Sequence, residues 1–237
     1  MNNEPAKPKI HIDFRTFFIL MLVAVVPMIV GTWWLFRSFE SAYLERTGSD
    51  LSRIADTAFV VVNNYLQNQI METAALTEVP VVREVVNRSN QDLGRDLNEI
   101  RKTIPKLEKA WAATGAQSPQ LRGVLSNPAA EFLRKYLSVN KSYRQVILTD
   151  FLGRLVAATE KPPRYYWALD EWWREAYADG IRGAVFIGNV RYDGTSRSYI
   201  LDLAQPVVNP DGSFAGMIKV ILDTQPIHAL LGSIQSD

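Results

Sequence analysis

Aromatic side chains gather in residues 165–177, which hold six of them in thirteen positions. Flat rings offer a large contact area, and a cation can sit against their faces. We therefore predict that Tyr166, Trp172 and Trp173 form the wall of a ligand pocket. The alternative is structural, because Trp173 and Tyr177 lie one helical turn apart and would then pin a short helix onto a sheet. The six aromatic residues are Tyr165, Tyr166, Trp167, Trp172, Trp173 and Tyr177.

Charged residues follow in the sequence Arg191-Tyr192-Asp193-Gly194. Asp193 can accept a hydrogen bond from an amine or hydroxyl group of a ligand, and Arg191 can supply positive charge. We include Arg191, Tyr192 and Asp193 in the predicted binding set. The alternatives are that Asp193 only begins an Asp-Gly turn and that Arg191 is ordinary soluble surface.

Asp202 is an unusual charge because it lies within an apolar strand expected over 198–208. Side chains alternate between the two faces of a strand, which places Asp202 on the same face as Ile200 and Ala204. An acidic group there is either solvated or buried with a partner. We expect it to face solvent.

Catalytic and metal-binding patterns are missing from the sequence. The two histidines, His11 and His228, lie at opposite ends of the chain, and there is no cysteine. Asp170 and Glu171 are adjacent on an expected helix and point apart, unlike an acid-base pair across a cleft. No phosphate-binding glycine loop occurs. We predict that the chain is not an enzyme and has no catalytic residues, no metal site and no cofactor.

The composition indicates a globular protein. Hydrophobic residues make up 47% of the chain and aromatic residues 11%, which is too apolar for a disordered segment. The net charge is +1 without a long basic block, so a surface for nucleic acid is excluded.

Residues 17–36 form an uncharged run that is long enough to cross a bilayer once as a helix. Trp33 and Trp34 lie at its far end, where indole rings favour the membrane interface, and Arg15 and Arg37 bracket it. A cleaved signal peptide is the alternative, although its apolar core is usually shorter. We predict a transmembrane helix and therefore a membrane-attached protein.

The orientation follows weakly from charge, since three basic residues precede the span and two follow it closely. Residues 1–16 are too short and polar to fold alone, so the simplest topology keeps them in the cytoplasm and exports the remainder. The lack of cysteine fits a bacterial exterior. We predict a single-pass protein of the bacterial inner (cell) membrane with a periplasmic or extracellular C-terminal domain.

A long helix is expected over 49–79, which has no glycine or proline and carries an apolar stripe at intervals of three and four residues. The stripe packs either on its own domain or on a second copy of the chain, and we predict a homodimer. Pro80 ends this helix. Shorter helices are expected over 81–87, 93–114 and 129–138.

The period then changes to that of strands. Residues 143–150 and 155–159 predict a hairpin with Gly153 at its turn. Further strands are expected over 184–190, 198–208 and 214–223, the last two joined by the tight turn Pro210-Asp211-Gly212. Helices over 170–178 and 226–234 complete an α+β fold with a mostly antiparallel sheet of about five strands.

Three sequence segments resemble the extracytoplasmic Cache sensor domains (PAS-like, PDC) of bacterial signalling proteins, of the double-Cache type. They are DEWWREAYADG, VRYDGTS and ILDLAQPVVNPDGSFAGMIKVILD. The resemblance implies a small-molecule ligand in a pocket on one face of the sheet. It also implies that the signal passes along the long helix through the membrane, as in a chemotaxis-type receptor.

The resemblance leaves the ligand's chemical class open. The amino-acid-binding branch of this family has an Arg two positions before the helix Trp and an Asp in the final strand, where this chain has Asp170 and Ile221. Arg164 and Arg191 could supply positive charge from nearby loops instead. We do not expect a standard amino-acid ligand.

In double-Cache sensors the final helix leads to a second module and an output domain. Because the sequence stops at Asp237, the resemblance predicts a further module and an output domain or partner signalling protein outside it. The alternative function is a membrane-tethered structural or assembly scaffold without a ligand. The expected division is a cytoplasmic N-terminus (1–16), a transmembrane helix (17–36), a long helix with a helical insert (37–140), the PAS-like sheet (141–223) and a C-terminal helix (224–237).

Overall fold

The computed structural model describes residues 13–92, 97–113, 119–177 and 185–234. The chain divides into two compact units, Met1–Thr57 and Ala58–Asp237, which are described separately below. Helix α1 (Phe14–Glu78) begins in the first unit and ends in the second.

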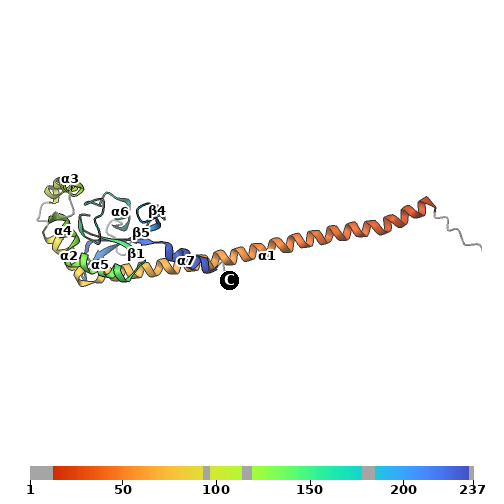
Figure 1. The fold of residues 1–237 in the computed structure, drawn as a ribbon, viewed down its shortest axis with the longest axis horizontal. Coiled ribbons are helices and arrows are strands. Elements are labelled where there is room, and N and C mark those ends of the chain that lie inside the picture. Colours follow the sequence, from red (N-terminus) through yellow and green to blue (C-terminus); the bar gives the residue numbers. More distant parts are fainter. Residues whose placement is uncertain (1–12, 93–96, 114–118, 178–184, 235–237) are drawn as a thin grey trace, which may run out of the picture. The chain divides into compact units, whose positions relative to one another are not determined.

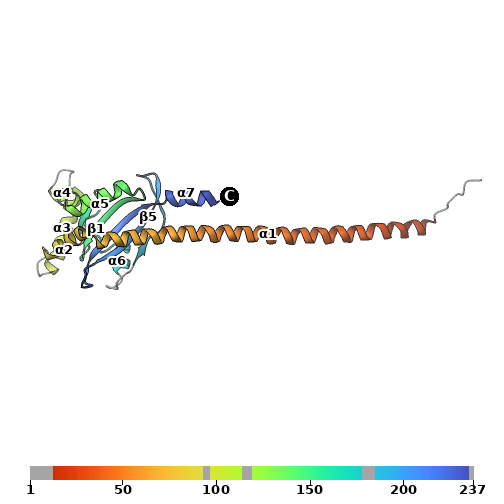
Figure 2. The same ribbon diagram turned by 90° about the horizontal axis from the view of Figure 1, so that it is seen from below.

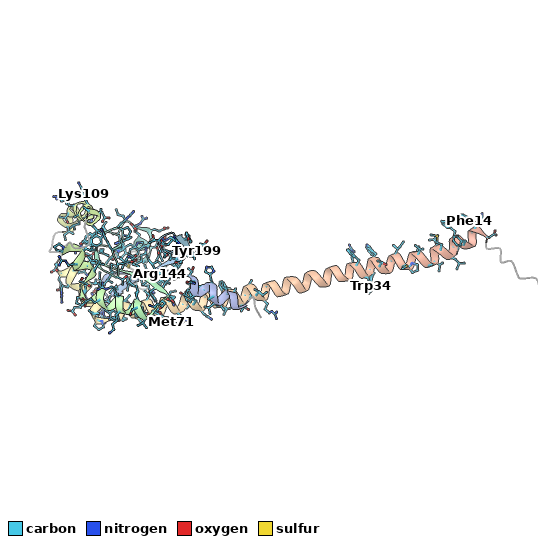
Figure 3. All side chains as sticks on the ribbon, viewed as in Figure 1. Phe14, Trp34, Met71, Lys109, Arg144 and Tyr199 are labelled. Atoms are coloured by element: carbon cyan, nitrogen blue, oxygen red, sulfur yellow. The ribbon has the colours of Figure 1, made fainter. Side chains whose placement is uncertain are left out.

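The first unit consists, in its described part, of the N-terminal portion of α1. Phe17–Arg37 is long and apolar enough to cross a membrane, and none of that window is buried. Figure 3 shows the side chains of Phe14 and Trp34 projecting from the helix. Pro27 lies inside the helix without ending it. The expected helix is confirmed, and its insertion into a membrane stays a prediction.

The second unit is built on one antiparallel sheet with the strand order β2-β1-β6-β5-β3, in which β4 also pairs with β5. This arrangement confirms the expected α+β class. The strands are β1 (Tyr143–Asp150), β2 (Leu155–Ala158), β3 (Phe186–Ile187), β4 (Arg191–Asp193), β5 (Ser198–Val208) and β6 (Phe214–Asp223).

Helices cover one face of the sheet. The C-terminal part of α1, α2 (Pro80–Gln91) and α5 (Pro128–Val139) lie on this side (Figure 2). Val82, Val86 and Leu133 from these helices are buried against Val146 and Leu148 of β1. The amide of Gln205 on β5 also donates to the backbone oxygen of Ile70, at 2.8 Å. This face therefore carries the main hydrophobic core.

The opposite face is covered by α6 (Glu171–Tyr177) and the loop before it (Figure 1). Trp172 and Trp173 of α6 and Trp167 of the loop are buried there with Ile147 and Met217. Helices α3 (Leu97–Ala113) and α4 (Pro119–Leu125) add Trp111 and Leu121 to this second core, and α7 (Gln225–Ile234) follows β6.

Two turns follow the sequence closely. Gly153 has φ 83° in the β1–β2 hairpin and Gly212 has φ 82° between β5 and β6, a conformation that glycine adopts without strain. Both turn predictions are confirmed.

Three local expectations are corrected. The strand expected over 184–190 is, in its described part, only Phe186–Ile187, and a separate strand occupies Arg191–Asp193 where a loop was expected. Helix α4 was not among the expected helices; it begins at Pro119, and proline is favoured at the first position of a helix. Asp202 does not simply face solvent, because Lys219 and Arg191 both pair with it.

Candidate ligand-binding cleft

The face of the sheet that carries α6 also carries polar residues on three neighbouring strands. The register places Gln145 of β1 and Asp202 of β5 on either side of Ile221 of β6. Side chains directly opposite each other share a face of the sheet. Lys219 lies two residues from Ile221 on the same strand and so belongs to this face as well.

A cleft of about 540 Å³ opens next to these residues. Its volume is within the usual range for small-molecule sites. Ile200, Ile221 and Pro163 contribute apolar side chains to its lining, which also contains charged and hydroxyl groups. The lining residues are Arg144, Gln145, Glu160, Lys161, Pro163, Arg191, Asp193, Thr195, Ser196, Ile200 and Ile221.

Asp193 organises the loop at one edge of the cleft. Its Oδ2 accepts hydrogen bonds from the backbone N–H of Ser196 at 2.9 Å and from the hydroxyl of Ser196 at 2.6 Å. Its Oδ1 accepts from the backbone N–H of Thr195 at 3.3 Å. The bonds from Ser196 are the main reason that the pKa of Asp193 lies below its usual value. Asp193 is therefore ionised and already engaged by its own loop.

Arg191, Asp202 and Lys219 form a charged cluster beside the cleft. Lys219 Nζ lies 2.8 Å from Asp202 Oδ2, and Arg191 Nη2 lies 3.2 Å from Asp202 Oδ1. The side chain of Lys219 is only 7% exposed, whereas that of Arg191 is 50% exposed. The ammonium also lies 5.1 Å from the ring of Trp172 and 5.6 Å from that of Trp167, within reach of cation–π attraction.

Arg144 joins another wall of the cleft to the end of β6. Its Nε donates to Oδ2 of Asp223 at 2.9 Å, and its Nη2 binds the same oxygen. The other oxygen of Asp223 accepts from the backbone N–H of Gln225, the first residue of α7, at 2.8 Å. Tyr65 of α1 donates to the backbone oxygen of Asp223 at 3.4 Å. Asp223 thus connects the cleft with both helices.

The predicted site residues separate in the structure. Arg191 and Asp193 line the cleft together. Tyr192 points away from them, as strand alternation requires, and its exposed ring packs against Tyr199 at 5.4 Å. Tyr166 is half-buried, and its backbone N–H donates to Glu108 at 2.9 Å. Neither tyrosine is among the lining residues of this cleft.

Trp172 and Trp173 lie in the core beneath α6. Trp173 stacks on Tyr177 with ring centroids 5.2 Å apart and donates from Nε1 to Thr149 at 3.2 Å. Trp172 is 4% exposed and reaches the cleft residues indirectly, through Lys219 and Asp202. The stacking of Trp173 on Tyr177 is the packing that the structural alternative described. A role for either indole in ligand contact stays a prediction.

Most lining residues were not singled out from the sequence. Arg144, Lys161 and Ser196 are common surface types, and only the antiparallel pairing of β1, β6 and β5 brings their segments together. Besides Arg191 and Asp193, the sequence drew attention to Ile221, which stands where the amino-acid-binding sensors have an acidic residue. Within the described part of the chain, no group of three or more His, Cys, Asp or Glu residues could hold a metal ion.

Comparisons with known proteins give structural matches only. No family model and no curated protein matches the chain. The ligand-binding domain of the Pseudomonas aeruginosa PAO1 amino acid chemoreceptor PctC, solved with GABA, is 16% identical and has a TM-score of 0.37 over 60% of this chain. The extracellular domain of a histidine kinase, vpHK1S-Z8, is 13% identical with a TM-score of 0.48 over 79%. The sensory domain of the Campylobacter jejuni chemoreceptor Tlp3 (CcmL), with isoleucine bound, is 16% identical with a TM-score of 0.37 over 73%.

These solved structures are ligand-binding, extracellular and sensory domains of chemoreceptors and a histidine kinase. The chain spans 59%, 63% and 65% of their respective lengths.

Proposed function

We propose that the chain is a membrane-anchored extracytoplasmic sensor domain that binds a small ligand in the cleft beside Arg191 and Asp193. The cleft itself carries the proposal. It has the volume of a small-molecule site, and it combines an apolar surface from Ile200 and Ile221 with polar groups that can orient a ligand. No nucleic acid takes part.

The transmission route runs through the end of β6. A ligand that shifts the cleft wall acts on Arg144, which binds Asp223, and Asp223 in turn contacts α7 and α1. The first segment of α1 contains the candidate span Phe17–Arg37. In this proposal the span crosses a bacterial inner membrane, and an output domain or partner signalling protein receives the signal.

Dimerisation through α1 belongs to the same proposal. Phe59 and Val60 are exposed on α1 of the second unit, and burial of such side chains against a second copy would be favourable. Two copies would then report ligand binding together.

A membrane-tethered scaffold is the second candidate, and the packing of the tryptophans favours it. Trp167, Trp172 and Trp173 fill the space between α6 and the sheet with their own rings. In a scaffold the polar cleft would be plain surface.

A thermal-shift screen of the full chain in detergent micelles separates the two candidates. Amines, organic acids, sugars and purines are tested one class at a time. A ligand present at a hundred times its Kd stabilises the folded state by about 2.7 kcal/mol. The sensor predicts such a rise for one class, and the scaffold predicts none.

The site is then checked with two matched variants. Asp193→Ala removes the carboxylate that holds Thr195 and Ser196 at the edge of the cleft and should reduce the shift. Asp211→Ala removes a similar carboxylate, which accepts from Ser213 in the β5–β6 turn outside the cleft, and should keep it. Equal loss in both variants, or no shift with any class, argues against the sensor.

A further inference from the structure

More basic than acidic residues line the cleft. Three basic residues line it, Arg144, Lys161 and Arg191, against two acidic ones, Glu160 and Asp193. Both oxygens of Asp193 already accept bonds from Thr195 and Ser196. An incoming ligand therefore meets three basic side chains and two acidic ones, and one of the acidic ones is already hydrogen-bonded by its own loop.

The charge of Arg191 is not fully neutralised by its partner. Asp202 carries one negative charge and pairs with two cations, of which Lys219 is the closer and the more buried. A buried ammonium needs a counterion more than an exposed guanidinium does. The cluster of Arg191, Asp202 and Lys219 thus keeps one net positive charge, and its half-exposed member lines the cleft.

Arg144 is shared between the cleft and the start of α7. Its side chain is 44% exposed, while its partner Asp223 is only 5% exposed. Two donors of Arg144 bind a single oxygen of Asp223, and the second oxygen holds the N–H of Gln225. A guanidinium can bind both oxygens of a carboxylate or phosphate group with two parallel N–H bonds, so a ligand anion competes with Asp223 for Arg144.

We propose that the cleft binds a small organic anion, whose charged group pairs with Arg191 and Arg144 and whose apolar part lies on Ile200 and Ile221. The anion takes Arg144 from Asp223 and thereby loosens the contact that holds the first turn of α7. This inference rests on the proposed ligand-binding function. It specifies the ligand class and the change of partner at Arg144, from Asp223 to the ligand, that transmits binding to α7.

Four six-carbon probes test the ligand class on the full chain in detergent micelles: hexanoate, hexyl phosphate, hexanamide and hexylamine. Isothermal titration should detect hexanoate or hexyl phosphate, and whichever binds tighter identifies the preferred acid group. The neutral amide and the amine should bind at least about tenfold more weakly, since each charge-assisted hydrogen bond lost costs that much.

Two arginine variants locate the anion. Arg191→Gln should weaken binding of the anionic probes about tenfold or more. Arg164→Gln is the matched control, because Arg164 pairs with Asp170 at 2.7 Å and is absent from the lining of this cleft, and it should bind normally. Preferential binding of hexylamine overturns the anion inference but leaves the sensor intact. Failure of these probes and of the four-class screen overturns both.

Hydrogen exchange of α7 tests the competition between ligand and Asp223. A saturating anionic probe should speed amide exchange at Gln225 and in the following turn. In Asp223→Ala this exchange should already be fast, because the acceptor of the Gln225 N–H is gone. The probe should then add nothing, and the anion should bind more tightly because the carboxylate that competes for Arg144 is gone. If the wild-type chain binds the probe through Arg191 and amide exchange in α7 does not change, the proposed displacement of Asp223 from Arg144 is overturned.

Discussion

Arg154 donates from Nε to the carboxylate of Asp150 at 2.7 Å, and this carboxylate is fully buried. The other oxygen of Asp150 accepts the backbone N–H groups of Leu152 and Arg154, at 3.0 and 2.9 Å. The buried Asp150 carboxylate therefore fixes the β1–β2 turn and also binds the Arg154 side chain, which neutralises its charge.

Removal of the Asp150 carboxylate should be costly. Asp150→Ala leaves the guanidinium of Arg154 largely buried without its counterion and should lower the free energy of unfolding by about 3–5 kcal/mol. Glu84→Ala is the control, because Glu84 and Arg88 form an exposed pair that should contribute less than about 1 kcal/mol. Urea unfolding measures both, and similar midpoints for the two variants would contradict the assignment.

Gly216 should not tolerate a side chain. A Cβ built there would lie 2.1 Å from the backbone oxygen of Thr149 on the neighbouring strand β1, which the sheet cannot move. Gly216→Ala should destabilise the protein by about 3 kcal/mol, at the upper end of overpacking effects. Gly123→Ala meets nothing within 4 Å on α4 and should be stabilising by up to about 1 kcal/mol. Thermal unfolding compares them, and a normal melting temperature for Gly216→Ala would refute the close approach.

The stability of the second unit should fall at alkaline pH. Burial raises the pKa of Tyr143 above its ordinary value of 10.0, as it also does for Tyr65. The unfolded chain then loses these protons at a lower pH than the folded chain. Stability is complete below about pH 10 and is lost as the pH rises from there toward the folded pKa. Urea unfolding at pH 8, 9, 10 and 11 measures the decline.

Two phenylalanine variants assign this decline to the buried ring. Tyr143→Phe loses the hydrogen bond with Thr73, at about 1 kcal/mol, but should show a shallower alkaline decline. Tyr192→Phe alters an exposed ring and should follow the wild-type profile. A decline in Tyr143→Phe as steep as in the wild type would exclude Tyr143 as its source.

Insertion of the candidate span should be sensitive to one charge. Val25→Lys places an ammonium in the middle of Phe17–Arg37 and should cost about 2.5–3.5 kcal/mol of insertion free energy. Carbonate extraction should then release a larger soluble fraction. Val60→Lys changes an exposed valine of the same helix outside the span and should stay with the membrane pellet. Release of both variants alike, or of neither, would count against Phe17–Arg37 as the anchor.

Most of the fold could be predicted because its elements have clear periods and boundaries. The strands β5 and β6 match their expected ranges, because both are rich in apolar residues and a strong turn signal separates the end of β5 from the start of β6. Short elements were harder. Strands β3 and β4 contain two and three residues, so neither is long enough to show a period, and pairing with β5 defines both.

The candidate site was less predictable than the fold. Arg191 and Asp193 were named from a local cluster, and the structure places both in the cleft. The sequence around Arg144 and Lys219 gives no sign of a site. Arg144 pairs with Asp223, 79 residues away in the chain, and Lys219 pairs with Asp202 on the neighbouring strand. The large aromatic rings of Trp172 and Trp173 led to the prediction of a pocket wall. The same size and apolarity suit packing in the core equally well.

The position of β6 has a consequence for biogenesis. It lies between β1 and β5 and is the last strand along the described chain. Because β1 and β5 do not pair with each other, the sheet has no continuous centre until residues 214–223 have been synthesised. Until then, the β1 edge of the β1–β2 hairpin has no neighbouring strand to pair with. A ribosome-bound nascent chain that ends before residue 214 should therefore be digested by protease. A longer nascent chain, in which residue 223 has emerged from the ribosome, should resist digestion.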